Sequence, residues 1–196
     1  MSAADEQLIQ RCRDGDLAAL EELLDRYRDR LMAFIYSVVR DYHLAEDIFQ
    51  ETFLRVYRQA RAFRAGASFK TWVYTIAVNL CRDALRKAKR RPEVSLENGT
   101  AVGETDRSRR MIDLIAGKDP GPREQAGARE LEAILKKELA GLSPEHRQVI
   151  ILSRLNGLKY REIAEVLGIP SGTVRSRLHY ALEQLRRGFR ERGIEG

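Results

Sequence analysis

The side chains that could perform acid–base, nucleophilic or metal chemistry are scattered along this chain. His43, His146 and His179 stand far apart, and no C-x-x-C pattern or nearby histidine accompanies Cys12 or Cys81. No carboxylate–histidine constellation and no phosphate-cradling glycine loop is present in the sequence. We therefore expect no catalytic residue, no metal site and no cofactor, and interpret the chain as a binding protein rather than an enzyme.

Residues suited to recognising a nucleic acid are concentrated near the C-terminus. Ile163, Ala164 and Leu167 recur at helical spacing and predict a short amphipathic helix. Gly168 can take the left-handed conformation that ends a helix, and Ser171 is a good N-cap for the next one. A helix, a glycine turn and a capped helix form the helix-turn-helix plan, whose second helix enters a DNA major groove.

The second helix of this motif has an apolar side and a polar side. Val174, Leu178 and Leu185 form the inward stripe, so Ser176 and His179 point outward, while Arg175 and Arg177 lie on the flanks, where they could meet phosphates. An amphipathic hairpin of any all-α protein would give a similar pattern. The candidate DNA-binding residues are Ser171, Gly172, Thr173, Arg175, Ser176, Arg177, His179 and Tyr180.

Composition and charge are compatible with a nucleic-acid partner. The 196 residues carry a formal net charge of +6, and 33% of them are charged. A basic chain favours polyanionic partners, although charge alone does not specify a function. The first residues lack the apolar core of a signal peptide, no apolar run is long enough to span a membrane, and the cysteines are isolated. We expect a cytoplasmic protein without membrane insertion.

Helical periodicity predicts four helices in the N-terminal half, over residues 5–14, 16–40, about 44–61 and 68–90. Asp16 and Ser68 are candidate N-caps of the second and fourth helices. The third helix has an unusual outer face, formed by Asp47, Gln50, Glu51 and Leu54. Two like charges four residues apart repel each other, and an outward leucine gains nothing from water. This face is either a solvated surface or a protein-docking surface.

The fourth helix has a polar outer side and a strongly basic end. Its last residues read RDALRKAKRR, which suits either a solvated helix end or a surface that follows phosphates. Asn79 is a poor helix former in the middle of this helix, so its presence there requires a reason. The candidate DNA-binding residues of this helix and of the loop before it are Phe63, Arg64, Thr75, Asn79, Arg82, Arg86 and Lys87.

Between these halves the periodicity fades. Residues 92–127 are polar and rich in glycine and proline, and this stretch is too long for a loop inside a compact domain. The predicted fold is all-α, with two helical domains joined by a flexible linker, the C-terminal one carrying the helix-turn-helix. The predicted boundaries are 1–91, 92–127 and 128–196.

Two blocks of the sequence resemble one protein family. DIFQETFLRVYRQARAF, followed by SFKTWVYTIAVNLCRDALRKAKRR, resembles region two of bacterial sigma factors. LSPEHRQVIILSRLNGLKYREIAEVLGIPSGTVRSRLHYALEQLRR resembles their region four. Nothing that resembles region three lies between them, and the chain is short. It is therefore similar to the extracytoplasmic-function (ECF) sigma factors.

The resemblance implies a function for each face. It places Asp47, Gln50, Glu51 and Leu54 on the helix that docks on core RNA polymerase. The loop around Phe63–Phe69 and the polar side of the fourth helix fall where the family reads the −10 promoter element, and Ser171–Tyr180 falls on the helix that reads the −35 element. The linker would lie along polymerase channels. The implied partners are core RNA polymerase, promoter DNA and an inhibitory anti-sigma factor.

One position departs from the family, and one alternative function stays open. Several members carry a further basic residue in the second turn of the recognition helix, where this chain has His179 and Tyr180. No arginine at that turn can therefore make a bidentate contact with guanine, and the sequence does not specify which −35 element the chain prefers. The alternative is a conventional helix-turn-helix regulator that binds DNA without polymerase, which would leave the outer face of the third helix unexplained.

Overall fold

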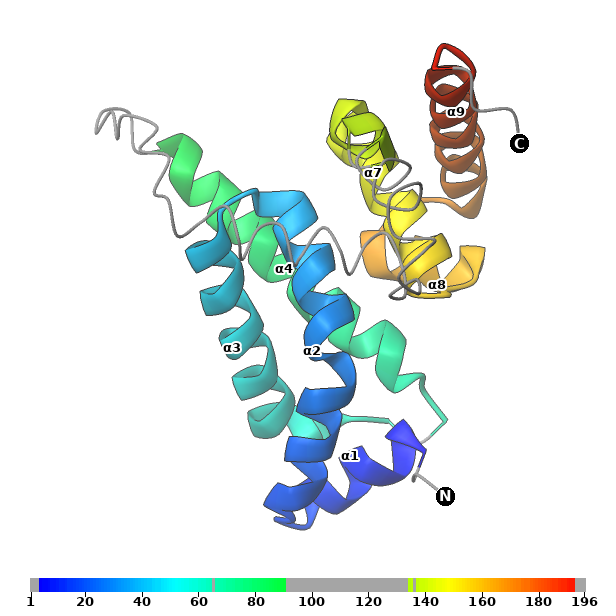
Figure 1. Cartoon of the computed structure of the whole chain (residues 1–196). Helices are drawn as coiled ribbons and strands as arrows, with labels where there is room; N and C mark the ends of the chain where they lie inside the picture. The colour runs from blue at the N-terminus through cyan, green and yellow to red at the C-terminus, as the bar shows by residue number, and fades with distance from the viewer. Residues whose placement is uncertain (1–3, 65, 91–133, 136, 193–196) are drawn as a thin grey trace, which may run out of the picture.

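The computed structural model describes residues 4–64, 66–90, 134–135 and 137–192, and every regular element in these ranges is a helix. The predicted all-α fold is confirmed (Figure 1). The predicted linker, 92–127, and the predicted start of the second domain at Ala128 lie outside the described residues. The domain boundaries therefore stay predictions. None of the described helices is both long enough and apolar enough to cross a bilayer.

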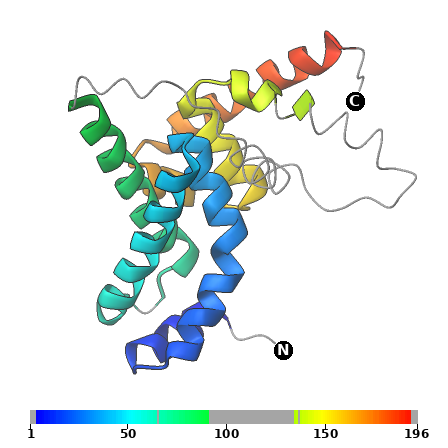
Figure 2. The same cartoon turned by 60° about the vertical axis from the view of Figure 1, so that its left-hand side comes forward.

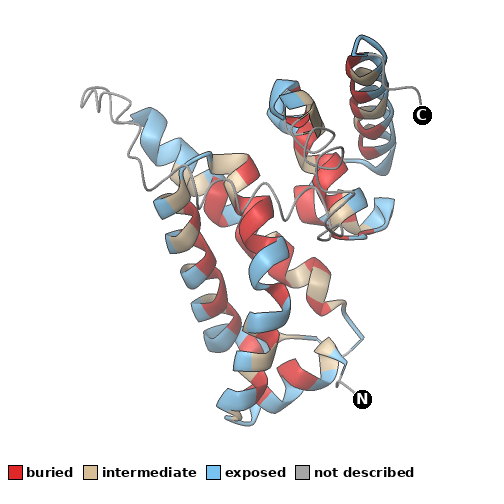
Figure 3. Cartoon of the chain, in the orientation of Figure 1, coloured by how far each residue is buried: buried red, intermediate tan, exposed pale blue. Residues whose placement is uncertain are grey.

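The N-terminal half is a bundle of long helices with a short helix across one end. α1 spans Asp5–Arg13, α2 Leu17–Val39, α3 Tyr42–Gln59 and α4 Phe69–Arg90, with a 3₁₀ turn, η1, at Ala60–Ala62. α2 packs against α1, α3 and α4. The apolar stripes predicted from the sequence point into this bundle, as the buried sides of α2 and α3 show in Figure 3. The basic end of α4 projects beyond the bundle and is exposed (Figures 1 and 3).

Polar caps determine where these helices begin. The Asp16 carboxylate accepts a hydrogen bond from the Ala19 N–H at 3.2 Å, and the Ser68 hydroxyl accepts one from the Thr71 N–H at 3.3 Å, so both predicted caps are confirmed. The predicted start of the third helix near Leu44 was wrong. Asp41 accepts a hydrogen bond from the Leu44 N–H at 2.9 Å, and this cap starts α3 at Tyr42.

The C-terminal half contains the predicted helix-turn-helix. Residues 137–141 are helical, α7 spans Pro144–Ile150, and one turn of π-helix, η2, continues it over Ile151–Leu155. α8 spans Tyr160–Leu167 and α9 spans Ser171–Arg190. Gly168 ends α8 in the left-handed conformation (φ 63°), as predicted. Ser171 is not the N-cap of α9: the extended Pro170 holds that position, and its carbonyl accepts the hydrogen bond of the Val174 N–H at 3.1 Å.

The two halves pack against each other. α4 contacts α8, and α2 contacts α7 and η2. In Figures 1 and 2 the C-terminal half, coloured from yellow to red, lies beside α2 and α4. The structure therefore joins the surfaces that the sequence assigns to two separate domains.

Candidate polymerase and nucleic-acid interfaces

The outer face of α3 gathers the residues predicted to dock on polymerase. Asp47, Gln50 and Leu54 are exposed, Leu54 at 48% of its full surface, while Glu51 is half-buried. The Glu51 carboxylate accepts a hydrogen bond from the Arg55 Nε–H at 2.9 Å, an i,i+4 pair on one side of the helix. Tyr57, which the sequence analysis missed, lies one turn beyond Leu54 and is 45% exposed. Its position three residues after Leu54 could have indicated from the sequence that it shares the outer face of this helix.

An open groove adjoins this face. It has a volume of about 750 Å³, and its lining includes Asp47 and Glu51 from α3 and Leu80, Ala84 and Lys87 from α4. Its lining combines apolar side chains with charged ones of both signs. It brings the predicted polymerase face next to Lys87, a predicted DNA-binding residue.

Three aromatic rings meet in tilted and edge-on contacts at the loop before α4. The ring centroid of Phe63 lies 5.2 Å from that of Trp72 and 6.3 Å from that of Phe69. Phe69 is fully buried, whereas Phe63 is half-buried and Arg64 is exposed. Phe63 therefore packs on the rings of Phe69 and Trp72 while part of its surface, and Arg64, stay accessible.

The outward side of α4 is less uniform than the sequence suggested. The Thr75 hydroxyl donates to the Thr71 carbonyl at 2.8 Å, and Arg86 pairs with Asp83 at 2.7 Å. Asn79 and Lys87 are exposed. Within the described part of the chain, no hydrogen bond holds the Asn79 side chain to a neighbouring loop.

Arg82 bridges the two halves. Its guanidinium donates to the Leu167 carbonyl at 2.6 Å, at the C-terminal end of α8. A carbonyl at a helix C-terminus has no partner within its own helix and carries partial negative charge, so a cation is favourable there. A residue predicted to bind −10 DNA is therefore hydrogen-bonded to the first helix of the helix-turn-helix.

Two buried polar residues, both missed by the sequence analysis, complete the contact between the halves. Asn156 is 2% exposed; its side-chain oxygen accepts a hydrogen bond from the Tyr74 hydroxyl, and its carbonyl accepts one from Lys70 at 3.1 Å. Arg147 is 7% exposed and donates to carbonyls of Leu139, Ala140, Leu142 and Ser37. Burial lowers the pKa of the Arg147 guanidinium, and the nearby charge of Arg40 lowers it further. Arg147 lies inside α7 and looks like any solvated helical arginine, and Asn156, with Gly157, marks only the end of η2, so neither position indicates a partner in the N-terminal half.

α9 presents most of its predicted DNA-binding residues to the outside. Ser171, Gly172, Arg175, Ser176, His179 and Tyr180 are exposed, Tyr180 at 58%, while Val174 and Leu178 are buried beneath them. The His179 ring lies 3.5 Å from the Glu183 carboxylate, one turn further along. This exposed face is available to a DNA groove.

Thr173 and Arg177 are half-buried at the edge of that face. The Glu145 carboxyl of α7 has a lowered pKa because of hydrogen bonds from its own backbone N–H and from the Ser143 hydroxyl, and the positive charge of Arg177 contributes further. Arg177 therefore lies within electrostatic reach of α7. We expect it to approach DNA less freely than Arg175 does.

The described residues include no cluster of three or more side chains that could hold a metal ion. Both cysteines are buried, and burial raises the pKa of the Cys81 thiol to about 12 and also raises that of Cys12. These thiols stay protonated and unreactive at neutral pH. What the arrangement offers is recognition: an acidic and apolar face, a basic helix end and an exposed recognition helix.

Comparison with known proteins identifies the family of this chain. The family model for sigma-70 region 2 matches residues 23–91, and that for sigma-70 region 4 matches residues 132–185. The ECF RNA polymerase sigma factor SigW of Bacillus subtilis is 33% identical over 183 residues, which cover 93% of this chain and 95% of SigW. The RNA polymerase sigma factor CarQ of Myxococcus xanthus is 34% identical over 187 residues, or 95% of this chain and 98% of CarQ.

A solved structure supports the same relationship. Sigma factor RpoE from Bartonella quintana, crystallised in complex with the anti-sigma factor NepR, superposes with a TM-score of 0.63 at 27% identity. The superposition covers 87% of this chain and 96% of RpoE. The sigma-70 family consists of non-enzymatic transcription factors. This chain belongs to its ECF group, the initiation factors that direct RNA polymerase to promoters.

Proposed function

We propose that the chain docks on core RNA polymerase through the outer face of α3 and carries the enzyme to promoters read at two elements. The observation that carries the proposal is the exposed group Asp47, Gln50 and Leu54, which faces away from the bundle and which DNA binding alone would not require. The −10 element would meet the Phe63 loop and the outer side of α4. The −35 element would meet the exposed face of α9.

The chain would act by binding alone, in the cytoplasm, where polymerase and promoter DNA occur. The NepR complex of the related RpoE supports the further expectation that an anti-sigma factor inhibits this chain as well. To test the proposal, the purified chain is mixed with core polymerase, separated by size-exclusion chromatography and assayed for run-off transcription. Co-elution and promoter-dependent transcripts are expected, whereas a conventional helix-turn-helix regulator would bind DNA and elute apart from polymerase.

Reading both elements at once requires the two halves to separate. Elements centred near −35 and −10 are about 85 Å apart along a duplex with a rise of about 3.4 Å per base pair. The surfaces assigned to them touch in this structure, since Arg82 contacts the end of α8 directly before α9. We infer that polymerase binding separates α4 from α8 and frees Arg82 for DNA.

A first prediction separates the reading of bases from the contacting of phosphates on α9. Ser176→Ala and His179→Ala are expected to alter the preference among −35 sequences, each lost base contact costing about 1–3 kcal/mol. Arg175→Ala is expected to weaken binding to all sequences alike and to lower the salt-dependence slope by roughly one. Titrations of duplex variants at several salt concentrations measure both effects. A reordered sequence preference in Arg175→Ala would show that this arginine reaches bases.

A second prediction concerns promoter opening and Asn79. Its exposed amide can both donate and accept hydrogen bonds, so it can match the edge of a base extruded from the −10 element. Asn79→Ala is expected to leave binding to polymerase and to −35 duplex unchanged but to reduce open-complex formation about tenfold, as the loss of one base contact would. A pre-melted −10 bubble should restore only part of the loss. Full activity on an ordinary duplex promoter would refute this role.

A further inference from the structure

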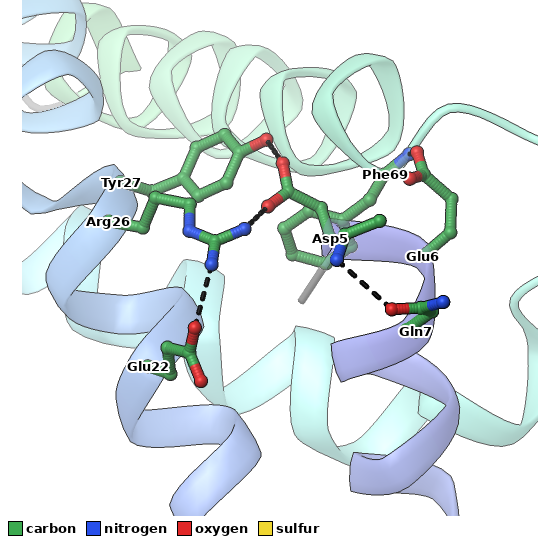
Figure 4. Close-up of polar contacts among 8 residues, drawn as sticks. Asp5, Glu6, Gln7, Glu22, Arg26, Tyr27 and Phe69 are labelled. Carbon is green, nitrogen blue, oxygen red and sulfur yellow. Dashed lines mark hydrogen bonds and ion pairs between the residues drawn. The ribbon is translucent and has the colours of Figure 1, made fainter. Parts of the chain in front are cut away.

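α1 precedes the part of the chain matched by the region-two model, and none of its residues belongs to the surfaces described above. Its first turn nevertheless reaches the start of α4. The Glu6 carboxylate accepts a hydrogen bond from the backbone N–H of Phe69 at 3.2 Å (Figure 4). Phe69 is the first residue of α4, and N–H groups in a first helical turn have no partner within their own helix. A carboxylate 63 residues earlier in the chain therefore supplies that partner.

The neighbouring carboxylate fixes the ring of the same phenylalanine. Asp5 accepts a hydrogen bond from the Tyr27 hydroxyl and pairs with Arg26 (Figure 4). Burial, with Asp5 beside it, raises the pKa of Tyr27, so its hydroxyl stays protonated and donates. The Tyr27 ring meets the Phe69 ring edge-on, with centroids 5.3 Å apart. Two successive residues of α1 thus hold the backbone and, through Tyr27, the side chain of Phe69.

Phe69 in turn supports the loop proposed to read the −10 element. Its ring lies 6.3 Å from that of Phe63 and 6.1 Å from that of Trp72, centroid to centroid. Between Phe63 and Phe69 the one backbone hydrogen bond among described residues joins the Ala67 N–H to the Arg64 carbonyl at 3.1 Å. The loop is therefore held mainly at its two ends, and Glu6 anchors the second of them.

We propose that Glu6 is a positioning residue for −10 recognition: by holding the Phe69 N–H, it sets the place of the Phe63–Phe69 loop against an extruded base. The inference rests on the proposed function, because it needs a base at that loop. A loop already held in its binding geometry loses less freedom when it captures a base. Without the anchor, the loop would still form but would distinguish bases less well.

Two conservative variants separate the reach of the side chain from its charge. Glu6→Gln keeps an acceptor oxygen at the same distance and loses the charge, whereas Glu6→Asp keeps the charge and withdraws the oxygen by one methylene. Gln and Asp are both tolerated in the first turn of a helix, and Glu6 is half-buried at the edge of α1 rather than in the core, so both variants should fold. Glu21→Ala, at an exposed site on α2, is the control for loss of a carboxylate.

The experiment measures base preference rather than activity alone. Holoenzyme reconstituted with each variant transcribes one promoter library randomised at the −10 element and another randomised at the −35 element, and the transcripts are counted by sequencing. Glu6→Asp is expected to flatten the preference at a −10 position about tenfold, with the −35 preference unchanged. Glu6→Gln and Glu21→Ala should match the wild-type chain within about twofold.

The outcomes distinguish the possible failures. A merely structural role would reduce the active fraction equally on all templates, so unchanged preference ratios in Glu6→Asp would overturn the positioning role, whatever the total yield. Flattening in Glu6→Gln equal to that in Glu6→Asp would also overturn it, because charge rather than reach would then matter. If the wild-type holoenzyme itself showed no −10 preference, the proposed function would fail and this inference with it.

Discussion

Reversing two charges on α3, in the double variant Asp47→Lys and Glu51→Lys, is expected to abolish binding to core RNA polymerase. The two side chains lie four residues apart on the face that carries the exposed Leu54. A docking partner that complements this acidic face would meet like charge instead, which costs several kcal/mol, so affinity should fall at least about 100-fold. Titration of labelled core polymerase with each chain measures the loss.

The fold should tolerate the change. The reversal removes the half-exposed Glu51–Arg55 ion pair, and pairs of this kind contribute about 0.3–0.5 kcal/mol. The matched control is Asp25→Lys with Asp29→Lys, which makes the same change in net charge at the same spacing on the exposed side of α2. The control should bind polymerase normally. Equal affinity of both double variants would contradict the docking assignment, and unfolding of the α3 variant alone would show that the face is structural.

Removing the buried guanidinium in Arg147→Ala is expected to lower the free energy of unfolding by about 3 kcal/mol, more than any other substitution considered for this chain. One side chain donates to carbonyls on the segment 139–142 and to the Ser37 carbonyl of α2. Truncation removes this donor from the Leu142 and Ser37 carbonyls and opens a cavity between the two halves, whereas the Ala140 carbonyl keeps a hydrogen bond from Arg40 at 3.1 Å and the Leu139 carbonyl one from the Leu142 N–H at 3.3 Å. Urea denaturation followed by circular dichroism should show a lower midpoint for the C-terminal half.

Two further variants test whether the stability lost in Arg147→Ala comes from the geometry of the buried guanidinium or from its charge. Arg154 carries the same charge on an exposed site of η2, so Arg154→Ala should change stability by less than about 0.5 kcal/mol. Arg147→Lys keeps a positive charge but loses the planar fork that reaches several carbonyls at once, so it should recover only part of the loss. An Arg147→Ala midpoint equal to that of Arg154→Ala would show that the buried contacts contribute little.

Local sequence patterns were sufficient for most of the helical architecture. The apolar stripes of α2 and α4 follow from their 3.6-residue period, and Asp16, Ser68 and Gly168 mark helix ends because their chemistry acts on adjacent backbone groups. The errors at Leu44 and Ser171 also concern helix starts. There, Asp41 and Pro170 each offered an earlier cap, and the period alone does not choose between neighbouring caps.

The sequence by itself thus determined most of the residues that face outward on α3, α4 and α9, because successive residues of a helix point in directions a fixed angle apart. Tertiary structure alone decided which of them meet a partner within the chain. Arg82 reaches the Leu167 carbonyl 85 residues away, Arg147 the Ser37 carbonyl 110 residues away, and Glu6 the Phe69 N–H 63 residues away. Each of these bonds satisfies a backbone group that helix geometry leaves open or burial would strand, and such a group can be assigned a partner only once the helices are packed.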